Sequence, residues 1–222
     1  MAERRRGEAG VGERRKGRQR LEVAERRAQL VALGLERFGR TAYDEVSIDD
    51  LARAAGISKG LLYHYFPTKR DYYVATVRAA AEQLLAASIP SPELPPLERL
   101  DRGLDAYLEY VERHGAAYVS LMRGGIGIDR EVQAIIEETR RRFAEKILDD
   151  LPLEKPNPLV RLLLRGWIGM VETVSVEWAA SRDVGRVELR DLLGRILIEA
   201  LDTELGWGLA EERHLARERA KR

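Results

Sequence analysis

The chain has 222 residues, of which 45% are hydrophobic, 34% are charged and 6% are aromatic. A chain of this length buries enough apolar surface to fold without cross-links, and the absence of cysteine excludes disulfides, thiolate metal sites and a cysteine nucleophile. Many charged and few aromatic residues favour helices over a β-sandwich, so we expect an all-α protein.

The formal net charge of +1 hides an uneven distribution of charged residues. Residues 1–20 contain 8 basic and 3 acidic residues, residues 21–73 contain 8 of each, and residues 74–210 contain 17 basic and 23 acidic residues. A polyanionic partner is therefore expected at the N-terminal end. The first residues lack the apolar core of a signal peptide, and charged residues interrupt the most apolar later stretch, 159–180. We therefore expect a cytoplasmic protein without a membrane span.

The first predicted segment is a basic arm, residues 1–20, which lacks apolar periodicity and is expected to be disordered. From Leu21 to Phe38 apolar residues recur at steps of three and four, which predicts the first helix. At the other end of the chain, residues 211–222 are expected to form a charged tail.

Side-chain caps mark two short helices after the first one. Ser47 can form a capping box with Asp50 at the start of a second helix, which ends by Gly56. Ser58 can cap a third helix, which Pro67 ends. Gly56 suits the turn between them because a side chain would resist a positive φ there.

A fourth helix is predicted from Thr68, which can form a capping box with Asp71, to about Ala87. Four prolines in the segment 89–96 then end the helical pattern. The later helices, which make about nine in all, are expected over 97–113, 116–123, 131–150, 157–181 and 188–205. The last two carry more apolar surface than one neighbour can cover, which favours a homodimer seam; a wholly internal packing pair is the alternative.

The two short capped helices and the turn between them have the spacing of a helix-turn-helix, whose second helix lies in the major groove of DNA. In that helix Leu62 and Phe66 would face inward, and Lys59, Tyr63 and His64 would face outward. Lys59 can bind a phosphate or a guanine edge, and Tyr63 and His64 can donate to phosphates or bases. Taken alone, each of these three could be an ordinary surface or packing residue.

The run DDLARAAGISKGLLYHYFPTKRDYY resembles the DNA-binding domain of the TetR family of bacterial transcriptional regulators. The resemblance implies a three-helix DNA-binding domain over 21–75, followed by a ligand-binding and dimerisation domain over 76–210. It implies a homodimer through the last two long helices, most often a repressor, which a small-molecule effector releases from a double-stranded DNA operator. Leu61 departs from the family pattern, in which a small or hydroxylated residue is common. The family's DNA contacts correspond to Ser47, Lys59, Gly60, Tyr63, His64, Tyr65 and Lys69.

An effector pocket in the C-terminal domain would be lined by large side chains on the apolar faces of its middle helices. Aromatic and thioether groups suit an irregular hydrophobic ligand, although the same groups commonly fill a core. The candidates are Tyr107, Tyr110, His114, Tyr118, Met122, Phe143, Trp167, Met170, Val174 and Trp178.

The sequence lacks the nucleophile-elbow, zinc-protease, dinucleotide-binding and phosphate-loop motifs of enzymes. Its three histidines lie in separate segments and form no ligand pair, so we expect no catalysis, no metal and no other cofactor. The alternative to a DNA-binding regulator is a helical small-molecule-binding or scaffold protein with a vestigial DNA-reading head. The basic arm could contact DNA or serve only as a solubilising tail.

Overall fold

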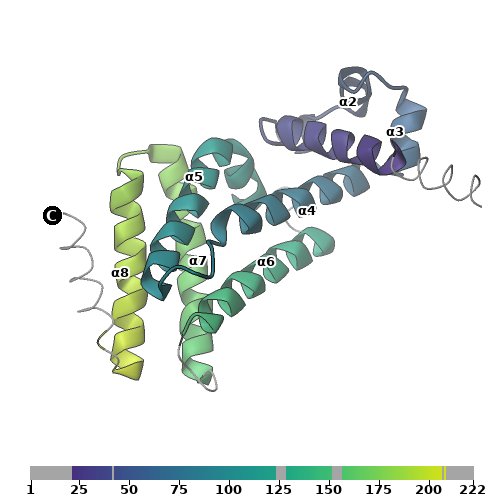
Figure 1. Cartoon of the computed structure of the whole chain (residues 1–222). Helices are drawn as coiled ribbons and strands as arrows, with labels where there is room; N and C mark the ends of the chain where they lie inside the picture. The colour runs from purple at the N-terminus through teal and green to yellow at the C-terminus, as the bar shows by residue number, and fades with distance from the viewer. Residues whose placement is uncertain (1–21, 42, 124–128, 152–156, 207, 209–222) are drawn as a thin grey trace, which may run out of the picture. The chain divides into compact units, whose positions relative to one another are not determined.

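The computed structural model describes residues 22–41, 43–123, 129–151, 157–206 and 208. The predicted basic arm and charged tail lie outside these residues. Over the described residues the protein is all-helical, with eight α-helices, one short 3₁₀-helix and no strand (Figure 1). The chain divides into two compact units with the boundary after Ala79, and each unit is described by itself.

The N-terminal unit contains a first helix over 22–38, followed by the short elements of the predicted helix-turn-helix. Its other elements are η1 (Tyr43–Glu45), α2 (Ile48–Ala54), α3 (Lys59–Tyr65) and the first half of α4 (Lys69–Ser88). Apolar side chains of the first helix, α2, α3 and α4 form its core, and the largest fully buried ones are Leu30, Leu51, Leu62 and Tyr72.

Side-chain caps start α2, α3 and α4, at the positions that the sequence predicts. Ser58 Oγ accepts a hydrogen bond from the Leu61 amide at 3.2 Å. The box before α4 is reciprocal, because Thr68 N donates to the Asp71 carboxylate at 3.0 Å and Asp71 N donates to Thr68 Oγ1 at 3.0 Å. The box before α2 is one-sided, because Ser47 Oγ accepts from Asp50 N at 3.4 Å while the Asp50 carboxylate instead binds Arg53.

The first helix packs closely against α4 at Gly34, in the middle of the helix. A Cβ at this position would lie 2.4 Å from Thr76 Oγ1 and 3.1 Å from Tyr72 Cε2. Tyr72 is fully buried, and its hydroxyl donates to the carbonyl of Leu30. Only a residue without a side chain allows this approach.

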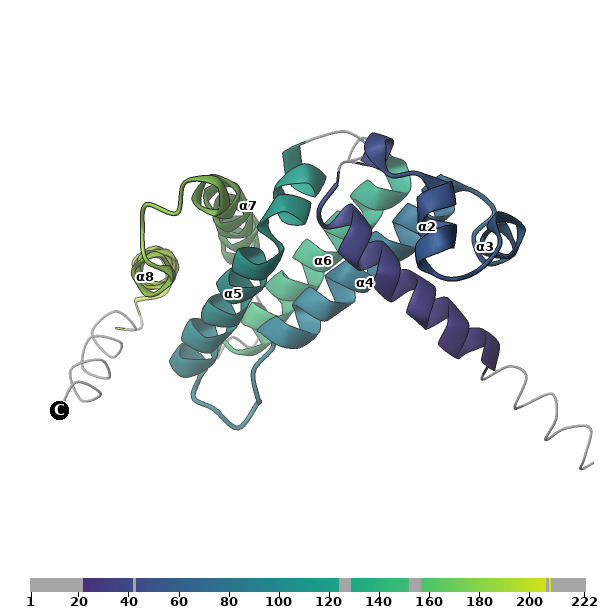
Figure 2. The same ribbon diagram turned by 90° about the horizontal axis from the view of Figure 1, so that it is seen from above.

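The C-terminal unit is a bundle of four long helices together with the end of α4 (Figures 1 and 2). Its helices are α5 (Pro96–Arg123), α6 (Arg130–Asp149), α7 (Pro158–Ser181) and α8 (Arg186–Leu205). α5 packs against both α7 and α8, α6 packs against α7, and α7 lies beside α8. The proline-rich segment before α5 interrupts the helical structure, as the sequence predicts.

The segments 97–113 and 116–123, predicted as separate helices, form the single bent helix α5. The bend lies at His114, whose backbone is non-helical (φ −115°, ψ 21°). Near the bend the carbonyl of Glu112 accepts a hydrogen bond at 2.8 Å from Nη2 of Arg182, the residue that caps the C-terminal end of α7. The described residues therefore contain one α-helix fewer than the nine that the sequence predicts.

Candidate nucleic-acid interface and effector region

The turn between α2 and α3 sets how α3 is presented. Gly56 has a φ of +66°, which side chains resist, and the Ile57 amide closes the end of α2 by donating to the Ala52 carbonyl at 3.0 Å. Leu62 and Phe66, four residues apart on α3, are both buried in the core of the N-terminal unit. The opposite face of α3 is therefore turned to solvent.

The exposed face of α3 brings together the residues that the sequence singles out. Lys59, Gly60, Tyr63 and His64 are exposed, as is Leu61 between them. We call these five residues the reading surface. Cationic, aromatic and aliphatic groups stand within two turns of helix, a combination that can meet both phosphates and base edges.

Lys59 does not stand alone on this surface, because it forms an ion pair with Asp49 of α2. Lys59 Nζ lies 3.0 Å from Asp49 Oδ2, and both side chains are at least half exposed. The hydrogen bond to this carboxylate raises the pKa of Lys59 above its usual value. Sequence reasoning missed Asp49, because its contact with Lys59 depends on how α2 and α3 are angled to each other.

The remaining predicted DNA contacts lie off the exposed face of α3. Ser47 caps α2 with its hydroxyl. Tyr65 is half-buried, with its ring edge-on to the ring of His64. Lys69 is held by η1, since its ammonium donates to the Asp44 carbonyl at 3.3 Å and lies 4.4 Å from the centre of the Tyr43 ring.

In the C-terminal unit, the predicted pocket residues have different surroundings. His114 is exposed at the bend of α5, with its ring centre 4.4 Å from that of Tyr110, and the side chain of Met122 lies outside the described residues. The buried members are Tyr107, Tyr118, Trp167 and Trp178, and the half-buried members are Tyr110, Phe143, Met170 and Val174. The ring nitrogens of both tryptophans are hydrogen-bonded to the backbone. Trp167 Nε1 donates to the Leu193 carbonyl, and Trp178 Nε1 donates to the Val184 carbonyl.

A polar cluster lies within this apolar core. The hydroxyls of Tyr107 and Tyr118 are hydrogen-bonded to each other across the bend of α5. Burial raises the pKa of both hydroxyls well above the usual range, so both are protonated at neutral pH. Ser175 of α7 is also fully buried, and its hydroxyl faces that of Tyr107, whose pKa it lowers against the effect of burial.

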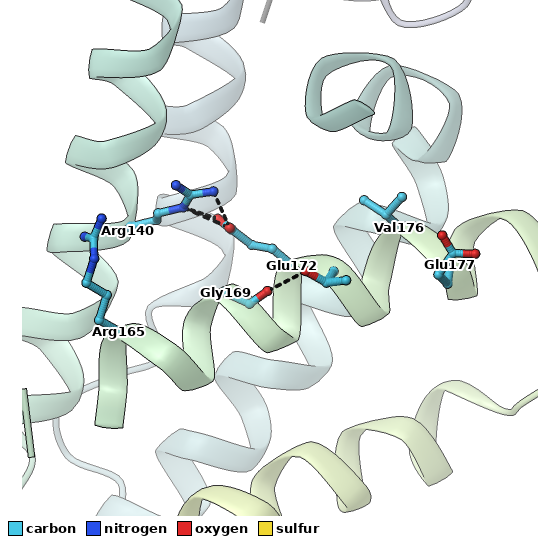
Figure 3. A pocket seen from close by; sticks show the side chains of 7 residues that line it. Arg140, Arg165, Gly169, Glu172, Val176 and Glu177 are labelled. Carbon is cyan, nitrogen blue, oxygen red and sulfur yellow. Dashed lines mark hydrogen bonds and ion pairs between the residues drawn. The ribbon is translucent and has the colours of Figure 1, made fainter. Parts of the chain in front are cut away.

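A hollow of about 550 Å³ opens between α6 and α7 (Figure 3). Arg140 of α6 crosses to α7, where its Nε donates to Glu172 Oε2 at 2.8 Å. Arg165 stands at the same hollow and binds Glu137 at 2.8 Å. The other residues that line it are Gly169, Thr173, Val176 and Glu177, so none of the ten predicted pocket residues does.

Comparison with known proteins identifies the family. The family model of bacterial regulatory proteins, tetR family, matches residues 30–76, and the model of the tetracyclin repressor-like C-terminal domain matches residues 96–199. A crystal structure of a tetR-family transcriptional regulator from Streptomyces coelicolor is 34% identical, with a TM-score of 0.77, over 87% of this chain and 89% of that one. The chain belongs to the TetR family.

Two curated relatives of this TetR-family chain differ in the direction of regulation. The transcriptional repressor KstR2 of Mycobacterium tuberculosis is 27% identical over 195 residues, which cover 81% of this chain and 97% of that protein. The transcriptional activator FasR of Mycolicibacterium smegmatis is 25% identical over 150 residues, which cover 67% and 68% of the two chains. Membership of the family makes this chain a DNA-binding transcriptional regulator, and the helix-turn-helix described above is its DNA-binding element.

Two further observations concern other kinds of site in the TetR-family chain. Among the residues that the structure describes, no three histidine, aspartate or glutamate side chains gather where they could hold a metal ion. No helix in this described part is long and apolar enough to cross a membrane.

Proposed function

We propose that this TetR-family regulator is a cytoplasmic homodimeric repressor, which a small-molecule effector releases from a double-stranded DNA operator. The observation that carries the proposal is the reading surface of α3, where Lys59, Tyr63 and His64 are exposed together while Leu62 and Phe66 anchor the other face. Two such surfaces in a dimer would enter successive major grooves, about 34–36 Å apart.

Each residue of the proposed interface has a chemical role. Tyr63 offers a ring for a thymine methyl group and a hydroxyl for a phosphate, and His64 can donate to either a phosphate or a base. Gly60 lets the backbone of α3 approach the DNA, because it has no side chain and only Ser58 Oγ comes as near as 4.0 Å to the place where one would begin. Lys59 contributes positive charge at the start of α3.

The other proposed contacts lie beside the reading surface and would bind the DNA backbone. The hydroxyl of Ser47 accepts from its own helix and retains its proton to donate to a phosphate. Tyr65 would donate its hydroxyl in the same way. The ammonium of Lys69 has three N–H donors, so it can bind a phosphate while its bond to η1 persists.

We assign dimerisation to α7 and α8, because they carry large apolar side chains that the single chain leaves open to water. Leu159 and Leu162 on α7 are 54% and 66% exposed, and Val187 and Leu192 on α8 are 55% and 41% exposed. Exposed apolar side chains at both ends of this helix pair are groups that a second copy of the chain would cover. A second copy, related by twofold symmetry, would also place two reading surfaces on one operator.

For the effector, we propose a hydrophobic molecule with a polar group, bound among the aromatic residues of the C-terminal unit. The pocket would draw on the sequence-based candidates, with Tyr107 and Tyr118 as its polar contacts. Support comes from their position, because both hydroxyls are buried within the apolar core of the C-terminal unit. The similarity to the repressor KstR2 along most of the chain supports repression. Because the family consists of transcriptional regulators, we propose no catalytic activity.

The experiment that tests the proposal is selection of bound sequences from random duplexes by the full-length protein. We expect a palindromic sequence that binds two copies of the chain, with an affinity that falls steeply as salt is raised because phosphate contacts release counterions. Tyr63→Ala should weaken binding at least tenfold, whereas Arg40→Ala, an exposed change in the same unit at a residue paired with Glu36, should not. Failure to enrich any sequence, together with weak salt dependence, would favour the scaffold alternative.

A further inference from the structure

The ion pair between Lys59 and Asp49 places a carboxylate at the edge of the reading surface. In a helix-turn-helix the first helix crosses the DNA backbone and the second enters the groove. Asp49 lies in the first turn of α2, which is the first of the two helices of the helix-turn-helix, and its side chain is 59% exposed. A carboxylate at this position repels phosphates, so it opposes binding to DNA of any sequence.

The same carboxylate also changes what Lys59 can contribute. A lysine that binds a phosphate normally releases a counterion from the DNA, and this sequence-independent gain drives non-specific binding. Here Asp49 Oδ2 lies 3.0 Å from Lys59 Nζ and already offsets part of the charge of the ammonium. A phosphate that approached Lys59 would therefore also meet the carboxylate of Asp49.

A base pair with both donors and acceptors suits the ion pair better than a phosphate does. In the major groove guanine presents two acceptors, O6 and N7, and cytosine presents the N4 donor. The ammonium of Lys59 can donate to guanine, and the carboxylate of Asp49 can accept from the cytosine amino group. Both charges then have a partner on one G·C pair, whereas a phosphate offers acceptors only. The adjacent O6 and N7 acceptors of guanine are also the base contact that lysine makes most often.

We propose that Asp49 is a specificity-determining residue of the DNA interface, which suppresses phosphate binding by Lys59 and selects a G·C pair in each half-site. The proposal rests on the proposed function, because it assumes that α3 enters the major groove. It identifies Asp49 as a second reader of sequence, located on α2 and outside the reading surface.

The test compares Asp49→Asn with Asp50→Asn in the full-length protein. The two variants make the same change of charge at neighbouring exposed positions, but Asp50 pairs with Arg53 at 2.6 Å rather than with Lys59. Binding is measured by fluorescence anisotropy, on the duplex selected by the wild-type protein and on a scrambled duplex, over a range of salt concentrations. Circular dichroism checks that each variant is folded.

We expect Asp49→Asn to bind the scrambled duplex about fivefold more tightly at 0.15 M salt, with a salt slope steeper by about one counterion. Its affinity for the selected duplex should rise less or fall, and a repeated selection should lose one G·C position in each half-site. Asp50→Asn should leave the ratio of the two affinities unchanged. In a Lys59→Ala background, Asp49→Asn should no longer steepen the salt slope.

Three results would overturn the inference while leaving the proposed function intact: equal changes on both duplexes, the same change in Asp50→Asn, or a steeper slope that persists without Lys59. If the wild-type protein bound no duplex specifically, the proposed function would fail, and this inference would fail with it.

Discussion

Replacing Gly34 with alanine tests the close packing of the first helix on α4. Inside a helix this change normally stabilises a protein by about 1 kcal/mol. At Gly34 the new Cβ would lie 2.4 Å from Thr76 Oγ1, which donates to the Tyr72 carbonyl at 2.9 Å, and 3.1 Å from the buried ring of Tyr72. Neither neighbour can move freely, and overpacking of this kind costs about 1–3 kcal/mol. We therefore expect Gly34→Ala to lower the free energy of unfolding by up to about 2 kcal/mol instead of raising it.

The assay is urea denaturation followed by far-ultraviolet circular dichroism, at a fixed protomer concentration because dimerisation contributes to stability. Gly60→Ala is the matched control, since its nearest neighbour lies 4.0 Å from the new Cβ, and it should stabilise the protein by up to about 1 kcal/mol. Adding Thr76→Ala to Gly34→Ala removes the overlapping oxygen and should restore part of the loss. Shifts of the same sign and size for Gly34→Ala and Gly60→Ala would refute the packing argument.

Three further predictions concern hydroxyls and the turn of the helix-turn-helix. Tyr107→Phe should lower the free energy of unfolding by about 1–2 kcal/mol, because it leaves the Tyr118 hydroxyl buried without its partner. In a double-mutant cycle, replacing both tyrosines with phenylalanine should cost less than the sum of the two single replacements. Strict additivity would contradict the pairing. Gly56→Ala should lower the free energy of unfolding by about 1 kcal/mol because of the positive φ alone, since nothing lies within 4 Å of the new Cβ. Thermal denaturation should show a smaller loss of stability for Gly56→Asn than for Gly56→Ala. Burial raises the pKa of Tyr72 and Tyr73 to about 12, so the folded protein keeps protons that the unfolded chain releases above pH 10. Their contribution to stability should be complete below pH 10 and should be lost between pH 10 and 12, and a flat stability profile over that interval in urea titrations would contradict it.

The reading surface was accessible from the sequence because short-range rules determine it. The Ser58 cap, the Gly56 turn and the four-residue spacing of Leu62 and Phe66 each involve interactions within a few residues. Once these are known, the outward direction of the opposite face follows. The pairing of Lys59 with Asp49 does not follow, because it depends on the angle between two helices, which the spacing of residues leaves open.

The C-terminal unit shows where such rules stop. Size and hydrophobicity identified residues that are mostly in or near the core, but they could not show that Trp167 and Trp178 use their ring nitrogens to bind backbone carbonyls. The same criteria also missed the hollow between α6 and α7, because several of the residues that line it are charged. Arg140 and Glu172 are 32 residues apart, and only the packing of their helices brings them together.

The bend at His114 links two parts of α5 that a straight helix would keep apart. Eleven residues of uninterrupted helix would separate Tyr107 from Tyr118 by about 16 Å along the axis, with both rings leaning in the same direction. Their hydroxyls meet only because the helix changes course between them. Straightening α5 would separate the two hydroxyls. Each buried O–H group would then need another hydrogen-bond acceptor. The bend of α5 and the hydrogen bond between Tyr107 and Tyr118 therefore form or are lost together.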